Sequence, residues 1–301
     1  MEERVVVNEV GLRDGLQNQA KIVETSGKLL LLDALLAAGL RHVEAASFVH
    51  PKIVPQMADG DQVCAVLPRK YEIDYSVLVP NRKGYERAVA AGMRSIAVVP
   101  ACSEGMNRSN LNQTRDEAVT EAMQLVRLGR DQGLTTRVYL AVAFACPFDG
   151  PTDPAIVEDL TAKMFDAGAN EVALADTIGA ANPASVARLF EKLSKRHGAG
   201  NLSAHFHDTQ GLALANAFAA LECGVRKFDA SVGGLGGCPF APGATGNVAT
   251  EDLVNMLEAC GYSTGVDLKK LTAAIELAES LVHQPLGGRW VNWQRHKAKA
   301  A

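Results

Sequence analysis

The chain has 301 residues, of which 48% are hydrophobic and 21% are charged, and its formal net charge is −4. This composition supplies a sizeable core for a soluble globular protein, and no apolar run approaches the roughly 20 residues that span a bilayer. The net charge is too small to imply a charged partner. Because no basic stripe with interleaved aromatic residues is present, nucleic-acid binding is not expected.

The amino-terminal residues do not resemble a targeting segment, because a strand-like run begins at Val5 with no basic-then-apolar leader before it. We therefore expect a cytoplasmic protein. Its six cysteines lack Cys-x-x-Cys spacing and are expected to be reduced thiols. The cationic run from Arg295 to Lys299 is expected to form a solvated tail.

A sequence repeat organises the chain. Related octets occur at 37–44, 90–97, 166–173 and 222–229. Each has the pattern of a helix end, a capping glycine and the start of a strand. Eight strands are expected to start near Val5, Arg41, Tyr75, Ser95, Arg137, Glu171, Asn201 and Lys227, with amphipathic helices between them at 114–131, 153–167, 182–196 and 210–222, among others.

Eight strands that alternate with helices through short loops predict a (β/α)₈ TIM barrel of the α/β class. The alternative is an open Rossmann-like sheet, but no Gly-x-Gly-x-x-Gly follows the first strand. After a helix near 250–260, one further helix is expected at 267–283. We therefore expect a single catalytic domain over 1–301, in which 262–301 is a C-terminal helical extension and tail.

Polar residues gather where the predicted strands end, which is where the catalytic groups of TIM barrels lie. They are Arg13 and Asp14 after the first strand, Glu44 and Ser47 at the second, Asp176 and Thr177 at the sixth, and His205 and His207 at the seventh. Loops are polar in any case, so this clustering supports an active site without deciding it.

His205 and His207 project from the same face of a strand because they are two residues apart. The alternative to a metal site is a hydrogen-bonded histidine pair. A carboxylate on a neighbouring strand favours the metal, and Asp14 is in reach because strands one, eight and seven are consecutive in a closed barrel. Asn247 adds a side-chain amide. This mixture favours Mg²⁺ or Mn²⁺, with ferrous iron and zinc as alternatives.

Two further features indicate catalysis at this face. Arg13 could stabilise a developing oxyanion, although a surface ion pair with Asp14 is the alternative. The glycine-rich loop 233–247 carries one thiol, Cys238, which suggests a lid that bears a proton donor. The alternative for the loop is a flexible connection.

The segment 9–18, Glu-Val-Gly-Leu-Arg-Asp-Gly-Leu-Gln-Asn, resembles the signature of hydroxymethylglutaryl-CoA lyases. The segments 47–57, 175–179, 205–211 and 233–247 also resemble that family, in the same order, so that the similarity runs from Val5 to about Leu271. Leu12, His50 and the pair Gln19-Ala20 depart from the usual pattern. His50 lies near the predicted barrel mouth, where the acyl group would bind.

The resemblance implies a homodimer that cleaves the acyl-CoA substrate 3-hydroxy-3-methylglutaryl-CoA (HMG-CoA) to acetyl-CoA and acetoacetate. It implies that Arg13 stabilises the enolate, that Cys238 takes part in proton transfer, and that His205 or a water in the metal's shell is the base. The implied ligands of Mg²⁺ or Mn²⁺ are Asp14, His205, His207 and Asn247. The implied supporting residues are Gln17, Glu44, Ser47, Asp176, Thr177 and Glu251.

Three alternatives remain open. The first is a lyase for a different 3-hydroxy-3-alkyl-glutaryl-type acyl-CoA. The second is an enzyme that condenses acetyl-CoA with a 2-oxo acid, although such synthases usually carry a long C-terminal extension. The third is a metal-binding scaffold, which would not need Arg13, a lid thiol and the ligands together.

Overall fold

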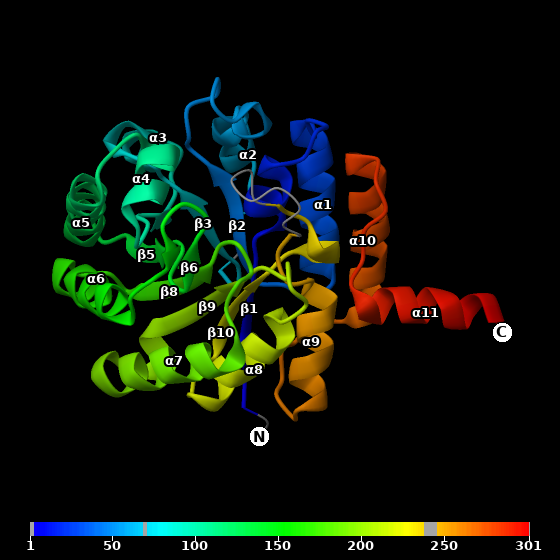
Figure 1. Cartoon of the computed structure of the whole chain (residues 1–301). Helices are drawn as coiled ribbons and strands as arrows, with labels where there is room; N and C mark the ends of the chain where they lie inside the picture. The colour runs from blue at the N-terminus through cyan, green and yellow to red at the C-terminus, as the bar shows by residue number, and fades with distance from the viewer. Residues whose placement is uncertain (1–2, 69–70, 238–245, 301) are drawn as a thin grey trace.

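The computed structural model describes residues 3–68, 71–237 and 246–300. Eight parallel strands close into a barrel in the order β1-β10-β9-β8-β5-β4-β3-β2, and helices surround it (Figure 1). The predicted (β/α)₈ barrel is therefore confirmed. The barrel strands are β1 Val6–Glu9, β2 His42–Ser47, β3 Asp74–Leu78, β4 Ser95–Val98, β5 Thr135–Leu140, β8 Glu171–Asp176, β9 Leu202–Phe206 and β10 Lys227–Ala230. A short antiparallel hairpin of β6 (Ala145–Cys146) and β7 (Gly150–Pro151) follows β5.

Several helices begin where the sequence supplies a capping side chain. Thr114 and Glu117 form a reciprocal capping box at the start of α5, and Asp153 accepts a hydrogen bond from the Ala155 amide at the start of α6. Gly168 ends α6 in the left-handed conformation. The helices are α1 Thr25–Ala37, α2 Gly60–Ala65, α3 Arg82–Ala90, α4 Glu104–Leu111, α5 Arg115–Asp131, α6 Pro154–Ala167, α7 Pro183–His197, α8 Ala213–Glu222, α9 Thr250–Ala259, α10 Leu268–Val282 and α11 Arg289–Ala300.

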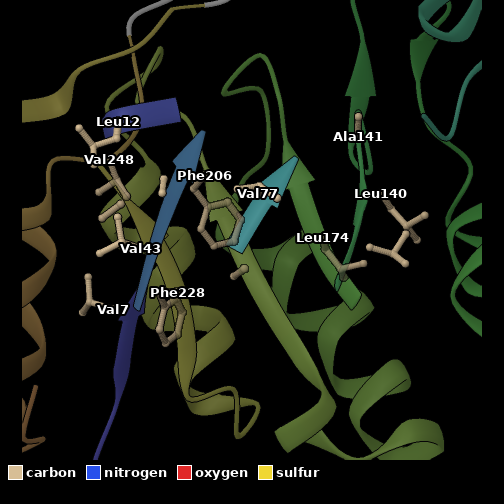
Figure 2. Packing of buried hydrophobic residues seen from close by; sticks show 14 of the residues in the cluster. Val7, Leu12, Val43, Val77, Leu140, Ala141, Leu174, Phe206, Phe228 and Val248 are labelled. Carbon is tan, nitrogen blue, oxygen red and sulfur yellow. The ribbon is translucent and has the colours of Figure 1, made fainter. Parts of the chain in front are cut away.

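The apolar core lies between the barrel strands and the helices. Val43, Leu174 and Phe228 are almost completely buried there, and Figure 2 shows them among the other side chains of this core. Because successive strand residues point to opposite faces, the neighbours of these residues project into the barrel lumen. The outward faces of the strands therefore hold the helices in place.

The barrel lumen is polar, whereas the lumen of a TIM barrel is usually filled by branched aliphatic residues. Within it, Arg137 donates from Nη2 to Ser203 Oγ and to Asp229 Oδ1, both at 2.8 Å. Its Nε lies 2.6 Å from Glu171 Oε1, and its Nη1 donates to the Tyr139 hydroxyl at 2.9 Å. A charged network thus supports the floor of the barrel mouth.

The C-terminal residues that were expected to be a solvated tail form helix α11. Asp252 on α9 accepts hydrogen bonds from the Trp290 and Arg289 amides, each at 2.8 Å, and so holds the start of α11. Arg295 pairs with Glu279 of α10 at 2.7 Å. In Figure 1 this helix extends outward from the barrel to the carboxyl terminus.

Two further observations concern the described residues only. None of their helices combines the length and the apolar character that crossing a membrane requires. Among their cysteines, Cys102, Cys146, Cys223 and Cys260 are free thiols.

Candidate metal centre and active site

The turn after β1 presents Arg13 and Asp14 to the barrel mouth. Residues Gly11–Gly15 form one π-helical turn in which both side chains are buried. A Cβ atom at Gly11 would lie 2.6 Å from Glu9 Oε1, and one at Gly15 would lie 2.8 Å from Ser231 Oγ. The tight turn therefore requires glycine on either side of the Arg-Asp pair, and single π-helical turns are frequent at functional sites.

Asp14, His205 and His207 come together at the mouth. Each offers a ligand atom, and these three atoms all lie within 4.8 Å of one another. Asp14 Oδ2 lies 3.6 Å from His207 Nε2 and 4.0 Å from His205 Nε2. The distances are longer than a hydrogen bond, and all three side chains are buried. The spatial arrangement that was predicted from strand order is therefore present.

Asn247 lies beside this cluster, and its contacts indicate whether a metal ion fits there. His207 and Asn247 form an isolated β-bridge, and Asn247 Nδ2 donates to Asp14 Oδ2 at 2.8 Å. Its Oδ1 is buried and finds no hydrogen-bond donor among the described residues. A buried orphan oxygen beside a carboxylate and two imidazoles has the donor chemistry of a divalent-cation site. The residues present therefore fit a metal ion.

Arg13 connects this cluster to Glu44. Its Nη1 lies 2.5 Å from Asp14 Oδ1, and its Nε and Nη2 lie 2.7 and 2.6 Å from Glu44 Oε2. Burial lowers the pKa of the guanidinium, but the charges of Glu44 and Asp14 outweigh burial, so its pKa lies above the ordinary value. Burial raises the pKa of Asp14, but the Arg13 charge and the interactions with His207 and His205 together outweigh burial, so its pKa lies below the ordinary value. Gln17 Nε2 donates to the same Asp14 Oδ1 at 2.8 Å.

Comparison with known proteins identifies the family. The HMGL-like family model matches residues 4–278. The chain belongs to the HMGL-like family. It is 45% identical to a hydroxymethylglutaryl-CoA lyase of Pseudomonas mevalonii over 89% of each chain. It is 41% identical to an (R)-citramalyl-CoA lyase of Chloroflexus aurantiacus over 94% of this chain and 93% of that one. The structure of the Bacillus subtilis HMG-CoA lyase matches 98% of both chains, with a TM-score of 0.93 and 41% identity.

The HMGL-like family is metal-dependent, and the Asp14, His205 and His207 cluster is where this member can hold an ion. Other predicted site residues support the loops around that cluster. Asp176 accepts hydrogen bonds from the Ala180 and Ala181 amides and shapes the loop after β8. Thr177 Oγ1 accepts one from the Val142 amide at 2.9 Å. Both are thus placed to support loops at the mouth.

Ser47 and Glu251 also support the backbone. Ser47, at the end of β2, accepts a hydrogen bond from the Val49 amide at 3.3 Å. Glu251 is buried at the start of α9 and accepts from the amides of Gly233 and Gly288. It therefore holds the beginning of the glycine-rich loop. Cys238 on that loop lies outside the described residues.

Sequence reasoning missed the polar groups near the metal cluster, namely Asp229, Arg137 and Tyr139. Asp229 Oδ2 lies 3.0 Å from His205 Nδ1, and the Tyr139 hydroxyl donates to Glu44 Oε2 at 3.4 Å. A signal was available, since Arg137 and Tyr139 alternate with apolar residues in a buried strand. That alternation shows which face each residue occupies but not which partner it meets.

Glu9 leads to a prediction about stability. Burial raises its pKa from about 4.5 to about 7, although the Thr250 hydroxyl and the Val232 and Gly11 amides donate to it. Between those pH values the folded protein holds a proton that the unfolded chain has released, so stability falls as pH rises. Glu9→Gln does not titrate. Its unfolding free energy relative to the parent should therefore rise by on the order of 2–3 kcal/mol between pH 5 and pH 8.

Urea unfolding of both proteins at each pH measures this difference. Glu3→Gln is the control, because Glu3 is exposed and pairs with Arg226 at the surface. A constant difference between the Glu9→Gln protein and its parent across this pH range would contradict the prediction.

Proposed function

We propose that this chain cleaves HMG-CoA to acetyl-CoA and acetoacetate by a retro-Claisen reaction. The observation that carries the proposal is the contact of Arg13 with Asp14, within a cluster that also holds His205 and His207. A fixed cation therefore lies beside the candidate metal ligands, where the reaction develops a negative charge. The high identity to proteins named as lyases of 3-hydroxy acyl-CoA substrates supports this choice over condensation or a scaffold role.

The ligands proposed for the ion are Asp14, His205, His207 and Asn247. One carboxylate, one amide oxygen and two imidazoles favour Mg²⁺ or Mn²⁺. When bound, such an ion supplies Lewis acidity that lowers the pKa of the substrate's tertiary hydroxyl. Gln17 and Arg13 both contact Asp14 Oδ1, so Oδ2 is the oxygen that faces the histidines.

The remaining steps use the chain's own groups. A base, either His205 or a water, removes the hydroxyl proton, and the resulting alkoxide becomes the ketone of acetoacetate as the C2–C3 bond breaks. The electron pair of that bond forms the acetyl-CoA enolate, whose charge the Arg13 guanidinium offsets. Cys238, or a water relayed by it, then protonates the enolate carbon. Glu44 holds Arg13 in place through two contacts.

A second substrate is favoured by one observation, the 41% identity to an (R)-citramalyl-CoA lyase. Citramalyl-CoA contains the same tertiary hydroxyl beta to the thioester, but its carboxylate is one methylene nearer. The same bond cleavage then yields acetyl-CoA and pyruvate. A pocket that discriminates by a single methylene typically does so by about 10- to 200-fold.

Product analysis separates the two substrates. The purified full chain is given each acyl-CoA in turn with Mg²⁺, and acetyl-CoA, acetoacetate and pyruvate are measured by mass spectrometry. We expect kcat/KM for HMG-CoA to exceed that for citramalyl-CoA by at least about 10-fold. A preference for citramalyl-CoA would assign the second substrate, and cleavage of neither would refute the proposed function.

We also propose that the protein is a homodimer, as the resemblance implies. Light scattering coupled to gel filtration measures its mass directly. A species at the 31.9 kDa of one chain would contradict this proposal.

A further inference from the structure

Asp229 contacts the ring nitrogen of His205 that faces away from the metal cluster. The two residues are register neighbours on the adjacent strands β10 and β9. Asp229 Oδ2 lies 3.0 Å from His205 Nδ1, and both side chains are buried. His205 Nε2 points the other way, toward Asp14. The Tyr139 ring packs edge-on against the imidazole, with ring centroids 5.7 Å apart, and so restricts its rotation.

Asp229 is itself held in one orientation. Its Oδ1 accepts hydrogen bonds from Arg137 Nη2 at 2.8 Å and from Asn8 Nδ2 at 2.9 Å. Arg137 is in turn fixed by Glu171 and Ser203. With Oδ1 engaged by two donors, Oδ2 is the oxygen left for the histidine. An ionised carboxylate can only accept hydrogen bonds, so His205 Nδ1 must be the donor.

We propose that Asp229 is a positioning residue that fixes His205 as the Nδ1–H tautomer, so that the lone pair of Nε2 faces Asp14 and His207. The inference rests on the proposed function, in which His205 binds a metal ion. It deepens that function because both ring nitrogens then have a task, Nδ1 toward Asp229 and Nε2 toward the ion. With the Nε2 lone pair engaged by the ion, His205 would act as a ligand, and a water would then be the base of the reaction.

Asp229→Asn tests the proposal because the surroundings decide how the new amide lies. Arg137 and Asn8 are both donors, so they would engage the amide oxygen and leave the NH₂ group facing His205 Nδ1. The proton would then move to Nε2, which would lose its lone pair toward the metal. Loss of such a supporting carboxylate typically weakens metal binding by about 10- to 100-fold. We expect that loss in the Mn²⁺ dissociation constant, measured by the EPR signal of free Mn²⁺.

A second measurement does not depend on the variant. NMR of the Mg²⁺-loaded full chain, labelled with ¹⁵N in histidine and assigned with His205→Gln, should show the proton of His205 on Nδ1.

Ser203→Ala is the matched control for the Mn²⁺ measurement on Asp229→Asn, because it removes another Arg137 contact while leaving Asp229 beside His205. That protein should bind Mn²⁺ as the parent does.

Two results would overturn the proposal: a folded Asp229→Asn protein with parental Mn²⁺ affinity, or a parent whose His205 proton is on Nε2. If the variant fails to fold, the NMR measurement still decides. Neither readout involves the acyl-CoA. A parent that binds Mn²⁺ through the Nδ1–H tautomer but cleaves no acyl-CoA would refute the proposed function and leave the role of Asp229 intact.

Discussion

Asp14→Ala is expected to abolish tight Mn²⁺ binding and to lower kcat/KM for HMG-CoA by roughly 10³-fold or more, because Lewis acidity contributes several kcal/mol to such reactions. Asp14 is the carboxylate of the proposed ligand set, and its Oδ2 faces both histidines. The fold should survive the change, since Arg13 keeps its contacts with Glu44. Isothermal titration with Mn²⁺ and an acetyl-CoA release assay measure the two effects.

Asp149→Asn is the matched control for this variant. Asp149 lies in the β6–β7 hairpin, is exposed, and accepts a hydrogen bond from the Gly105 amide. The Asp149→Asn protein should bind Mn²⁺ and turn over substrate as the parent does. An Asp14→Ala protein that is folded by circular dichroism and retains full activity would remove Asp14 from the ligand set.

Arg13→Lys should lower kcat by about 10²- to 10³-fold while Mn²⁺ affinity changes little. Lysine keeps the positive charge, so Glu44 and Asp14 are not left as uncompensated buried carboxylates, which would cost about 3–5 kcal/mol. It cannot reproduce the planar fork that reaches Glu44 through Nε and Nη2 and Asp14 through Nη1. The enolate would therefore lose the donor that is positioned for it.

Steady-state kinetics and Mn²⁺ titration separate these effects. Arg82→Lys, which alters an exposed pair with Glu86, is the control and should leave both quantities unchanged. If the Arg13→Lys protein kept the parental kcat, the planar guanidinium of Arg13 would not be what stabilises the enolate. A large loss of Mn²⁺ affinity would instead mean that Arg13 acts through Asp14.

The barrel could be predicted because its signals are local and repeated. A capping glycine followed by a short apolar run recurs along the chain, and each run became a strand near the expected position. Asp14, His205 and His207 could be placed together for the same reason, since strand order in a closed barrel determines which ends are neighbours. In the structure, the ligand atoms of these three residues do lie close together.

The polar lumen could not be predicted, because its contacts join residues far apart in the sequence. Arg137 meets Asp229 92 residues further along the chain. In the sequence, Arg137 and Asp229 each lie in a strand where polar and apolar residues alternate, which is also the pattern of a strand with one solvated face. Helix α11 was missed for a related reason, since the contacts of Asp252 and Glu279 that hold it come from other helices.

Acetyl-CoA release from HMG-CoA by the chelator-treated full chain, before and after addition of Mg²⁺ or Mn²⁺, tests the central claim most directly. We predict negligible release without metal, recovery on adding either ion, and one acetoacetate formed for each acetyl-CoA. Full activity in the presence of excess chelator, or metal addition without any acetoacetate, would contradict the proposed metal-dependent cleavage.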